Sequence, residues 1–323
     1  MTRVYITIDT EYSSSIATRK RSKGRQENFD RCIMCETPEG PVGIGYQLDM
    51  FDQHSLKAVF FVDPMPALLW GVEAISDVVG PIIERGHDVQ LHLHTEWLAL
   101  AGTANPLGDR TGQNIKDFTF DEQCELIDLA RSTLMAAGAP APIAFRAGNY
   151  GANDDTLRAL AELGFQYDTS HCPGIADSHC DISLGPDDRL PLRHLGVTEV
   201  PIGCIESFGG GLRHGQITAL SRREILAAIR YTRKHKLRHF TLVSHSFELM
   251  SRKRRLPNHV VRRRFELLCA DIAAMKGVRT ATYAEDPPRL ELMDEPPPIL
   301  PHNILLTAER LAEQVIGNAL YGA

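Results

Sequence analysis

The chain has 323 residues, of which 43% are hydrophobic and 24% are charged, as in an ordinary globular protein. This length is enough for one large α/β barrel or for two smaller domains. The formal net charge of −6 argues against a nucleic-acid-binding protein that relies on bulk positive charge.

Strand-like and helix-like segments alternate along the chain. Strands are predicted at residues 3–9, 57–62, 87–94, 142–147, 165–170, 197–202, 239–246 and 278–283. Helices are predicted at residues 44–54, 71–85, 121–137, 154–163, 221–235 and about 261–272. Such alternation indicates a parallel sheet with flanking helices, and seven or eight strands over this length favour a barrel over an open sheet. We therefore expect a single-domain α/β protein of the (β/α) barrel type over residues 1–285.

Two segments interrupt this alternation. Residues 12–42 form a long polar insertion after the first strand, and we expect it to cover a substrate cleft. The glycine-rich residues 207–215 are predicted to form a second, flexible wall of that cleft.

The end of the chain has a different composition. Residues 286–302 are proline-rich and predict a linker, and residues 303–323 predict an amphipathic helix. Its apolar face is predicted to pack back on the barrel, with homo-oligomer formation or membrane-surface contact as alternatives. The basic stretch 251–268 is expected to be a solvated face, or else a patch that attracts anionic substrates or lipid headgroups.

The location of the protein is predicted from what the sequence lacks. No charged and then apolar leader precedes the first strand, and no stretch approaches the roughly 18 consecutive apolar residues of a membrane span. The seven cysteines are odd in number and scattered, which is typical of reduced thiols. We expect a cytoplasmic protein without a transmembrane segment.

Polar residues gather where the predicted strands end. They are Asp9 and Glu11; His92, His94, Glu96 and Trp97; Arg146 and Tyr150; Asp168; and His245, Ser246 and Glu248. Because the C-terminal strand ends of such barrels meet at one face, these residues predict a single site.

The chemistry that suits this set is metal-assisted hydrolysis. Asp9 and Glu11 are two residues apart on a strand and point to one side, where they repel unless a cation lies between them or one is protonated. His92 and His94 also share a side. Imidazole together with carboxylate suits Zn²⁺ or a similar divalent ion. A carboxylate base, an arginine that orients it and a histidine acid would complete the reaction.

Two other clusters are weaker metal candidates. Cys32 and Cys35 form one C-x-x-C pair without a second pair, and His171, Cys172, His179 and Cys180 lie in an irregular segment. We interpret both as incidental.

The ordered motifs resemble those of the polysaccharide deacetylases, the chitooligosaccharide deacetylase-like group of carbohydrate esterase family 4. The resemblance runs from Val4 to about Phe247 and rests on "TIDTE", "KAVFFV", "GHDVQLHLHTEW", "FRAGNYG" and "LVSHS". It implies a distorted (β/α)7-type barrel, a divalent metal cofactor with Zn²⁺ favoured, and a carbohydrate substrate.

The resemblance also implies residue roles. Asp9 would be the general base, oriented by Arg146, and His245 the general acid. Glu11 and His92 would hold the metal. Tyr150 and Leu242 would line the substrate site. We interpret Trp97, apart from the resemblance, as part of the local core or as a substrate-binding part of the cleft wall, and favour the core.

This chain departs from the family pattern at the metal motif. The family places its histidines four residues apart, but the residue four after His92 is Glu96, and His94 follows after two. We favour the two histidines, because imidazole is the better zinc ligand, and keep Glu96 as the alternative ligand. The segment after Arg146 is one residue longer than in the family, and Glu11 replaces the usual aspartate.

The resulting hypothesis is a hydrolase that removes an N-acetyl or other N-acyl group from an amino sugar. A nucleotide- or lipid-linked glycan precursor in surface polysaccharide or lipopolysaccharide biosynthesis is the expected setting. One alternative is hydrolysis of another C–N bond or of a glycosidic bond, in which carboxylates act without metal. The other is a glycan-binding protein that has lost catalysis.

Overall fold

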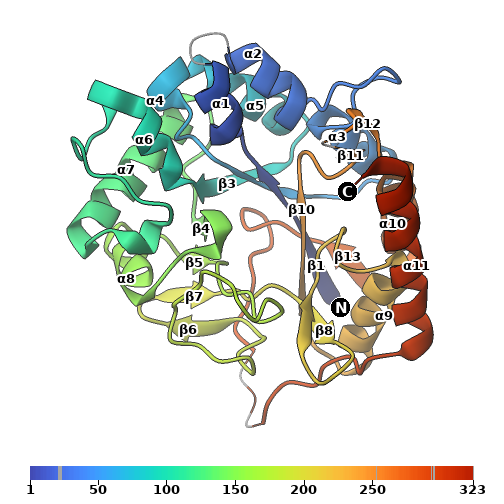
Figure 1. Cartoon of the computed structure of the whole chain (residues 1–323). Coiled ribbons are helices and arrows are strands. Elements are labelled where there is room, and N and C mark those ends of the chain that lie inside the picture. The colour runs from blue at the N-terminus through green and yellow to red at the C-terminus, as the bar shows by residue number, and fades with distance from the viewer. Residues whose placement is uncertain (21–23, 252, 292, 294, 323) are drawn as a thin grey trace.

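The structure is a computed structural model, and it describes residues 1–20, 24–251, 253–291, 293 and 295–322. A curled sheet occupies the centre of the molecule, and helices surround it (Figure 1). This is the mixed α/β, barrel-like architecture predicted from the alternation of elements.

The central sheet has nine strands, and eight of them follow the order β10-β1-β2-β3-β4-β5-β7-β6, while β13 pairs with β1 beside β2. Neighbours are parallel except for β6, which runs antiparallel to β7. The strands are β1 (Thr2–Thr10), β2 (Val59–Val62), β3 (Asp88–Leu93), β4 (Ala144–Ala147), β5 (Tyr167–Asp168), β6 (Leu192–His194), β7 (Val197–Glu199), β10 (His239–His245) and β13 (Val278–Thr280).

Backbone hydrogen bonds outside the strands connect the open side of the curled sheet. Ile202 N–H donates to the His171 carbonyl, and Gly203 N–H donates to the Thr241 carbonyl of β10. Val243 N–H then donates to Gly215 at the end of a hairpin formed by β8 (Cys204–Glu206) and β9 (Leu212–His214). These bonds satisfy β10 groups that an open sheet edge would leave unpaired.

The helices around the sheet begin at side-chain caps. Thr119, Asn153 and Ser221 each accept a hydrogen bond from the backbone three residues later and form capping boxes, which stabilise a helix start by about 1 kcal/mol. The main helices are α3 (Ile44–Gln53), α5 (Glu73–Glu84), α7 (Phe120–Ala136), α8 (Asp154–Glu162), α9 (Arg222–Lys234), α10 (His259–Ala274) and α11 (Ile304–Tyr321). Shorter ones are α1 (Ser14–Lys20), α2 (Gly24–Asn28), α4 (Ala67–Trp70) and α6 (Leu98–Ala101).

The core forms where these helices cover the sheet. β2 and β3 are buried along their whole length, as expected for parallel strands covered on both faces. Phe60 of β2 and Phe51 of α3 are fully buried and meet edge to face with ring centroids 6.4 Å apart. This rigid packing fixes the C-terminal strand ends, where the site lies.

All eight predicted strands are present, and other segments hold elements that the sequence did not predict. That residues 12–42 cover a substrate cleft stays a prediction. The insertion 12–42 contains α1, α2 and a π-helix at Phe29–Ile33, and its Ile33 and Cys35 are in the core. Between the strands predicted at 165–170 and 197–202, where the sequence predicted no element, the structure has β6. The division into barrel, linker and tail stays a prediction, although the tail does form the helix α11.

The docking face of α11 is also different from the one predicted. Ile304, Leu311 and Val315 are 69%, 50% and 68% exposed, whereas Arg310 is buried. The helix therefore contacts the body through its polar side. Within the described residues, no helix has both the length and the hydropathy that crossing a membrane requires.

Candidate metal centre and active site

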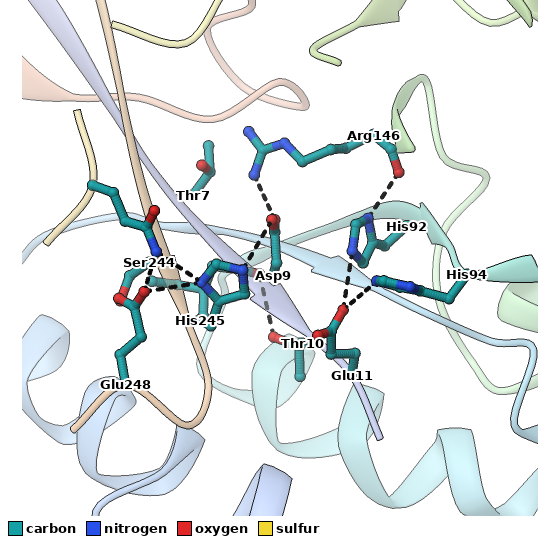
Figure 2. Close-up of polar contacts among 12 residues, drawn as sticks. Thr7, Asp9, Thr10, Glu11, His92, His94, Arg146, Ser244, His245 and Glu248 are labelled. Atoms are coloured by element: carbon teal, nitrogen blue, oxygen red, sulfur yellow. Dashed lines mark hydrogen bonds and ion pairs between the residues drawn. The ribbon is translucent and has the colours of Figure 1, made fainter. Parts of the chain in front are cut away.

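Four strands of the central sheet, β10, β1, β3 and β4, bring the predicted polar residues together. Asp9 is paired in register with His245 of β10, and His92 of β3 is paired with Arg146 of β4. Glu11 follows β1 directly, and its side chain points toward the two histidines of β3 (Figure 2). The site therefore lies at the C-terminal ends of parallel strands, as the sequence analysis predicted.

Three of these residues form a cluster suited to a metal ion. One ligand atom each from Glu11, His92 and His94 lies within 4.8 Å of the others, the one such group of three or more found among the described residues. Glu11 Oε2 lies 2.5 Å from His94 Nε2 and 3.2 Å from His92 Nε2. One carboxylate and two imidazoles are a donor set that Zn²⁺ and similar ions accept, so the residues fit the implied cofactor.

Hydrogen bonds orient both imidazole rings of this cluster. His92 Nδ1 lies 2.8 Å from the Arg146 carbonyl oxygen, so it must carry the proton and donate it. His94 Nδ1 lies 3.1 Å from Glu96 Oε2 and donates to it in the same way. With Nδ1 engaged in this way, each ring turns its Nε2 atom toward Glu11, and a deprotonated Nε2 there can offer its lone pair to an ion. Proteins commonly fix metal-binding histidines by such outer hydrogen bonds.

Glu96 therefore contacts the outer nitrogen atom of His94 rather than the cluster itself. β3 ends at Leu93, and the chain turns into a short 3₁₀ helix at Thr95–Trp97. The backbone stays extended up to His94, so side chains alternate between the two faces of the strand only as far as this residue. The structure groups His92 with His94, next to Glu11.

The longer segment after Arg146 contributes to the position of His94. A Cβ atom added to Gly148 would lie 2.7 Å from the His94 ring, too close for a real contact. The glycine therefore lets the backbone pack flat against the imidazole. The next two residues, Asn149 and Tyr150, have positive φ angles of 56° and 57°, which are strained for side chains other than glycine.

Charges within the cluster keep the carboxylate ionised. Burial would raise the pKa of Glu11, but His94 and His92 lower this pKa well below its usual value. Burial likewise lowers the pKa of His94, and the charge of Glu11 more than reverses this effect. The site is a pair of imidazoles around one carboxylate that is negatively charged at neutral pH.

Asp9 is held by an arginine from across the barrel. Arg146 Nη1 donates to Asp9 Oδ1 at 2.5 Å, and both side chains are buried. The guanidinium also lies over the Phe61 ring, 4.3 Å from its centroid, and its Nε donates to the Thr169 carbonyl at 3.3 Å. This arrangement fixes the Asp9 carboxylate in one orientation.

His245 lies on the other side of Asp9, with its Nε2 atom 3.9 Å from Asp9 Oδ2 (Figure 2). Its Nδ1 atom donates to Glu248 Oε1 at 3.0 Å. Gln216 and Thr218 also donate to this oxygen, and Ser244 donates to the other. Burial lowers the pKa of His245, but the hydrogen bond and charge of Glu248 outweigh burial and raise it to about 9.

A small cavity of about 80 Å³ connects these groups. Its lining is Asp9, Glu11, His92, His94, Ala147, Asn149, Tyr150 and His245. Tyr150 Oη is buried and has no hydrogen-bond partner among the residues that the structure describes. An unpartnered buried hydroxyl is costly, which is consistent with a polar partner arriving in the cavity.

The other two residues predicted to bind substrate lie elsewhere. Trp97 is 1% exposed and packs edge-on against Trp70, with ring centroids 5.4 Å apart. Leu242 is 0% exposed within β10. Neither lines the cavity. Trp97 lies in the local core, the place favoured from the sequence, and Leu242 offers no surface to a ligand in this structure.

The sequence analysis missed two polar residues beside the site. Asp63 follows β2, and its Oδ1 atom accepts from the backbone of His94 at 3.4 Å. Like Asp9 and Glu11, Asp63 is a carboxylate at the end of a predicted strand, so the sequence could have indicated it. Gln216 contacts Glu248 and His245, but it lies in a glycine-rich loop with no motif to mark it.

Comparisons with known proteins identify the fold. No family model matches the chain, and no curated protein matches it. A solved structure from Mycobacterium smegmatis, assigned as a polysaccharide deacetylase, has a TM-score of 0.55 at 16% identity and covers 91% of this chain and 95% of its own. PuuE allantoinase has a TM-score of 0.50 at 12% identity, covering 88% and 91%.

A family 4 carbohydrate esterase from Streptomyces lividans, solved with acetate, is similar over 87% of this chain and 92% of its own, with a TM-score of 0.44 at 12% identity. Identities this low relate the chains by fold alone. The Mycobacterium smegmatis structure confirms the predicted barrel, and function rests on the site.

Proposed function

We propose that this protein is a metal-dependent hydrolase that removes an N-acyl group, in the first instance acetyl, from an amino sugar. One observation carries the proposal. A single cavity is lined by a Glu–His–His cluster, by a carboxylate that an arginine holds, and by a histidine that a second carboxylate keeps protonated. Acyl transfer to water needs these functions together.

In this proposal Glu11, His92 and His94 hold the ion, and Glu96 orients His94 without binding the ion. A divalent ion bound there would act as a Lewis acid that polarises the acyl oxygen and lowers the pKa of water. The two outer hydrogen bonds, to the Arg146 carbonyl and to Glu96, would keep each Nε2 atom directed at the ion.

The residues of the chain carry the proton transfers. Asp9 takes a proton from the attacking water, and Arg146 fixes the carboxylate in the orientation that accepts it. A C–O bond forms at the acyl carbon as the C–N bond breaks. His245 gives its Nε2 proton to the departing nitrogen, so the products are a free amine and a carboxylic acid. Glu248 keeps His245 charged until that step.

The experiment measures acetate release from a panel of N-acetylated amino sugars, including N-acetylglucosamine oligomers and nucleotide-linked N-acetylglucosamine. We expect the chelated protein to be inactive and added Zn²⁺ to restore turnover. The Asp9→Asn variant should lose about 10²- to 10⁴-fold in kcat, the range typical of a lost general base. Asp109→Asn, the same change at an exposed carboxylate, is the matched control. Full, metal-dependent activity of Asp9→Asn would contradict the assignment.

A second candidate is hydrolysis of a different C–N bond, as in a cyclic amide or ureide. The structural similarity to an allantoinase at a TM-score of 0.50 favours keeping it. An assay of the same protein preparation for ring opening of allantoin and related ureides distinguishes this candidate from the deacetylase. Turnover of ureides without acetate release would replace the first proposal by the second.

A further inference from the structure

The C-terminal helix α11 is docked with its charged side inward. Glu309 pairs with Arg223 at 3.1 Å, and Arg310 pairs with Glu224 at 3.2 Å, both from the α9 region. Glu313 pairs with Arg264 of α10 at 2.5 Å. These ion pairs include every charged residue of the helix, so each of them is tied to the body of the protein.

The opposite side of α11 is apolar and open. Its exposed residues include Ile304, Leu305, Ala308, Leu311, Ala312, Val315, Ile316, Ala319 and Leu320. The helix runs along the outer edge of the molecule, outside α9 and α10 (Figure 1). A face of this kind on an ordered surface helix is unusual for a monomer, because large apolar patches normally mark a contact site.

The width of the apolar face indicates the kind of partner. At about 100° per residue these side chains spread over roughly half of the helix circumference. The seam of a helix pair is narrower and is flanked by charged residues that set its register. A broad face without charges fits a flat apolar surface better than a single partner helix.

The surroundings of the helix add aromatic and cationic groups. Near its N-terminus, Phe208 is 73% exposed and lies beside His302, with ring centroids 5.7 Å apart. Beside its C-terminus, Lys253, Arg254 and Arg255 are exposed, and Arg254 donates to the Ala319 carbonyl at 3.4 Å. Cations beside an apolar face are complementary to anionic headgroups.

We propose that α11 lies in the plane of an anionic lipid surface, with its apolar face among the acyl chains and Lys253, Arg254 and Arg255 at the headgroups. The ion pairs on its inner side keep the body of the protein attached. This inference rests on the surface alone and does not depend on the hydrolase proposal. A second copy of the chain is the competing occupant.

The test is co-sedimentation of the full chain with phosphatidylcholine vesicles that contain or lack phosphatidylglycerol. Wild type should bind the anionic vesicles, and a Leu311→Gln/Val315→Gln variant should bind them at least about tenfold more weakly. Met135→Gln, which removes a 44% exposed apolar side chain of α7, is the matched control and should bind like wild type. Thermal unfolding checks that all variants fold.

A second variant separates the electrostatic contribution. Lys253→Gln/Arg255→Gln should weaken binding to anionic vesicles roughly fivefold for each lost cation and leave weak binding to neutral vesicles unchanged. Two outcomes would overturn the proposal: no sedimentation of wild type with anionic vesicles at low salt, or a dimer in light scattering that Leu311→Gln/Val315→Gln dissociates while vesicle binding is absent.

Discussion

At the scale of single residues, two outer hydrogen bonds decide which nitrogen atom each histidine of the cluster presents. His92 donates from Nδ1 to a backbone carbonyl, and His94 donates from Nδ1 to Glu96. A backbone carbonyl cannot be removed by mutation, but the Glu96 carboxylate can. A mutation of Glu96 can therefore show whether this residue orients His94 or binds the metal ion itself.

Changes at Glu96 should separate its two possible roles. As the partner of His94, Glu96→Gln keeps an acceptor oxygen and should retain nearly wild-type Zn²⁺ affinity, whereas Glu96→Ala should lose about 10- to 100-fold. Isothermal titration calorimetry of the metal-stripped protein measures both. If Glu96→Gln lost affinity as severely as Glu96→Ala, while His94→Ala kept it, Glu96 and not His94 would be the ligand.

A second residue-scale prediction concerns the pH range of activity. Glu248 raises the pKa of His245 to about 9, so the proposed acid stays charged at neutral pH and activity should fall as pH rises through about 9. Glu248→Gln removes the raising charge, so this alkaline limb should move down by at least about one pH unit. The pH profile of kcat tests it, and an unshifted limb would show that His245 does not supply the proton.

At the scale of elements, a buried acid pair joins two strands beneath the site. Asp168 of β5 and Glu199 of β7 are partners in the parallel register, and both are 0% exposed. Burial raises the pKa of Glu199, and the charge of Asp168 raises it further, to well above its usual value. Glu199 therefore holds a proton in the folded state, and one negative charge remains near Arg146.

This pair predicts a pH-dependent stability. Because the pKa of Glu199 is higher in the folded than in the unfolded state, folding binds a proton here, and stability falls as pH rises from the unfolded value through the folded one. Glu199→Gln imitates the neutral acid, so its Tm should fall less than that of wild type as pH rises above the ordinary pKa of a glutamate. Glu199→Ala, which leaves the Asp168 carboxylate without this partner, should be destabilised by about 1–3 kcal/mol. Parallel Tm curves for wild type and Glu199→Gln would contradict the assignment.

Some helices and strands could be predicted from sequence patterns, and others could not. Strand β2 was predictable because its sequence, Val59–Val62, is a continuous apolar run, which favours a buried strand. α11 was predicted as a helix, but its docking face was not, because periodicity reveals an apolar stripe and not whether ion pairs hold the other side. The hairpin β8–β9 was not predicted. Its strands have three residues each in a glycine-rich segment, which is too short to show an alternation of apolar and polar residues.

At the scale of the whole molecule, the barrel assembles the site from segments far apart in the chain. Asp9 and His245 are 236 residues apart and meet because β1 and β10 are neighbours. The sequence predicted that strand-end residues converge, since parallel strands end at one face. It could not predict how the backbone turns after β3, which decides the place of Glu96, or that Trp97 would be enclosed by Trp70.

The central claim, a metal ion held by Glu11, His92 and His94, is tested most directly by anomalous diffraction at the zinc edge from crystals grown with Zn²⁺. We predict one strong peak in the cavity, about 2.0–2.2 Å from a Glu11 oxygen and from both histidine Nε2 atoms, and no peak in crystals of His92→Ala. The absence of a peak at this cluster in the wild type, or a peak bound instead by cysteines, would contradict the account.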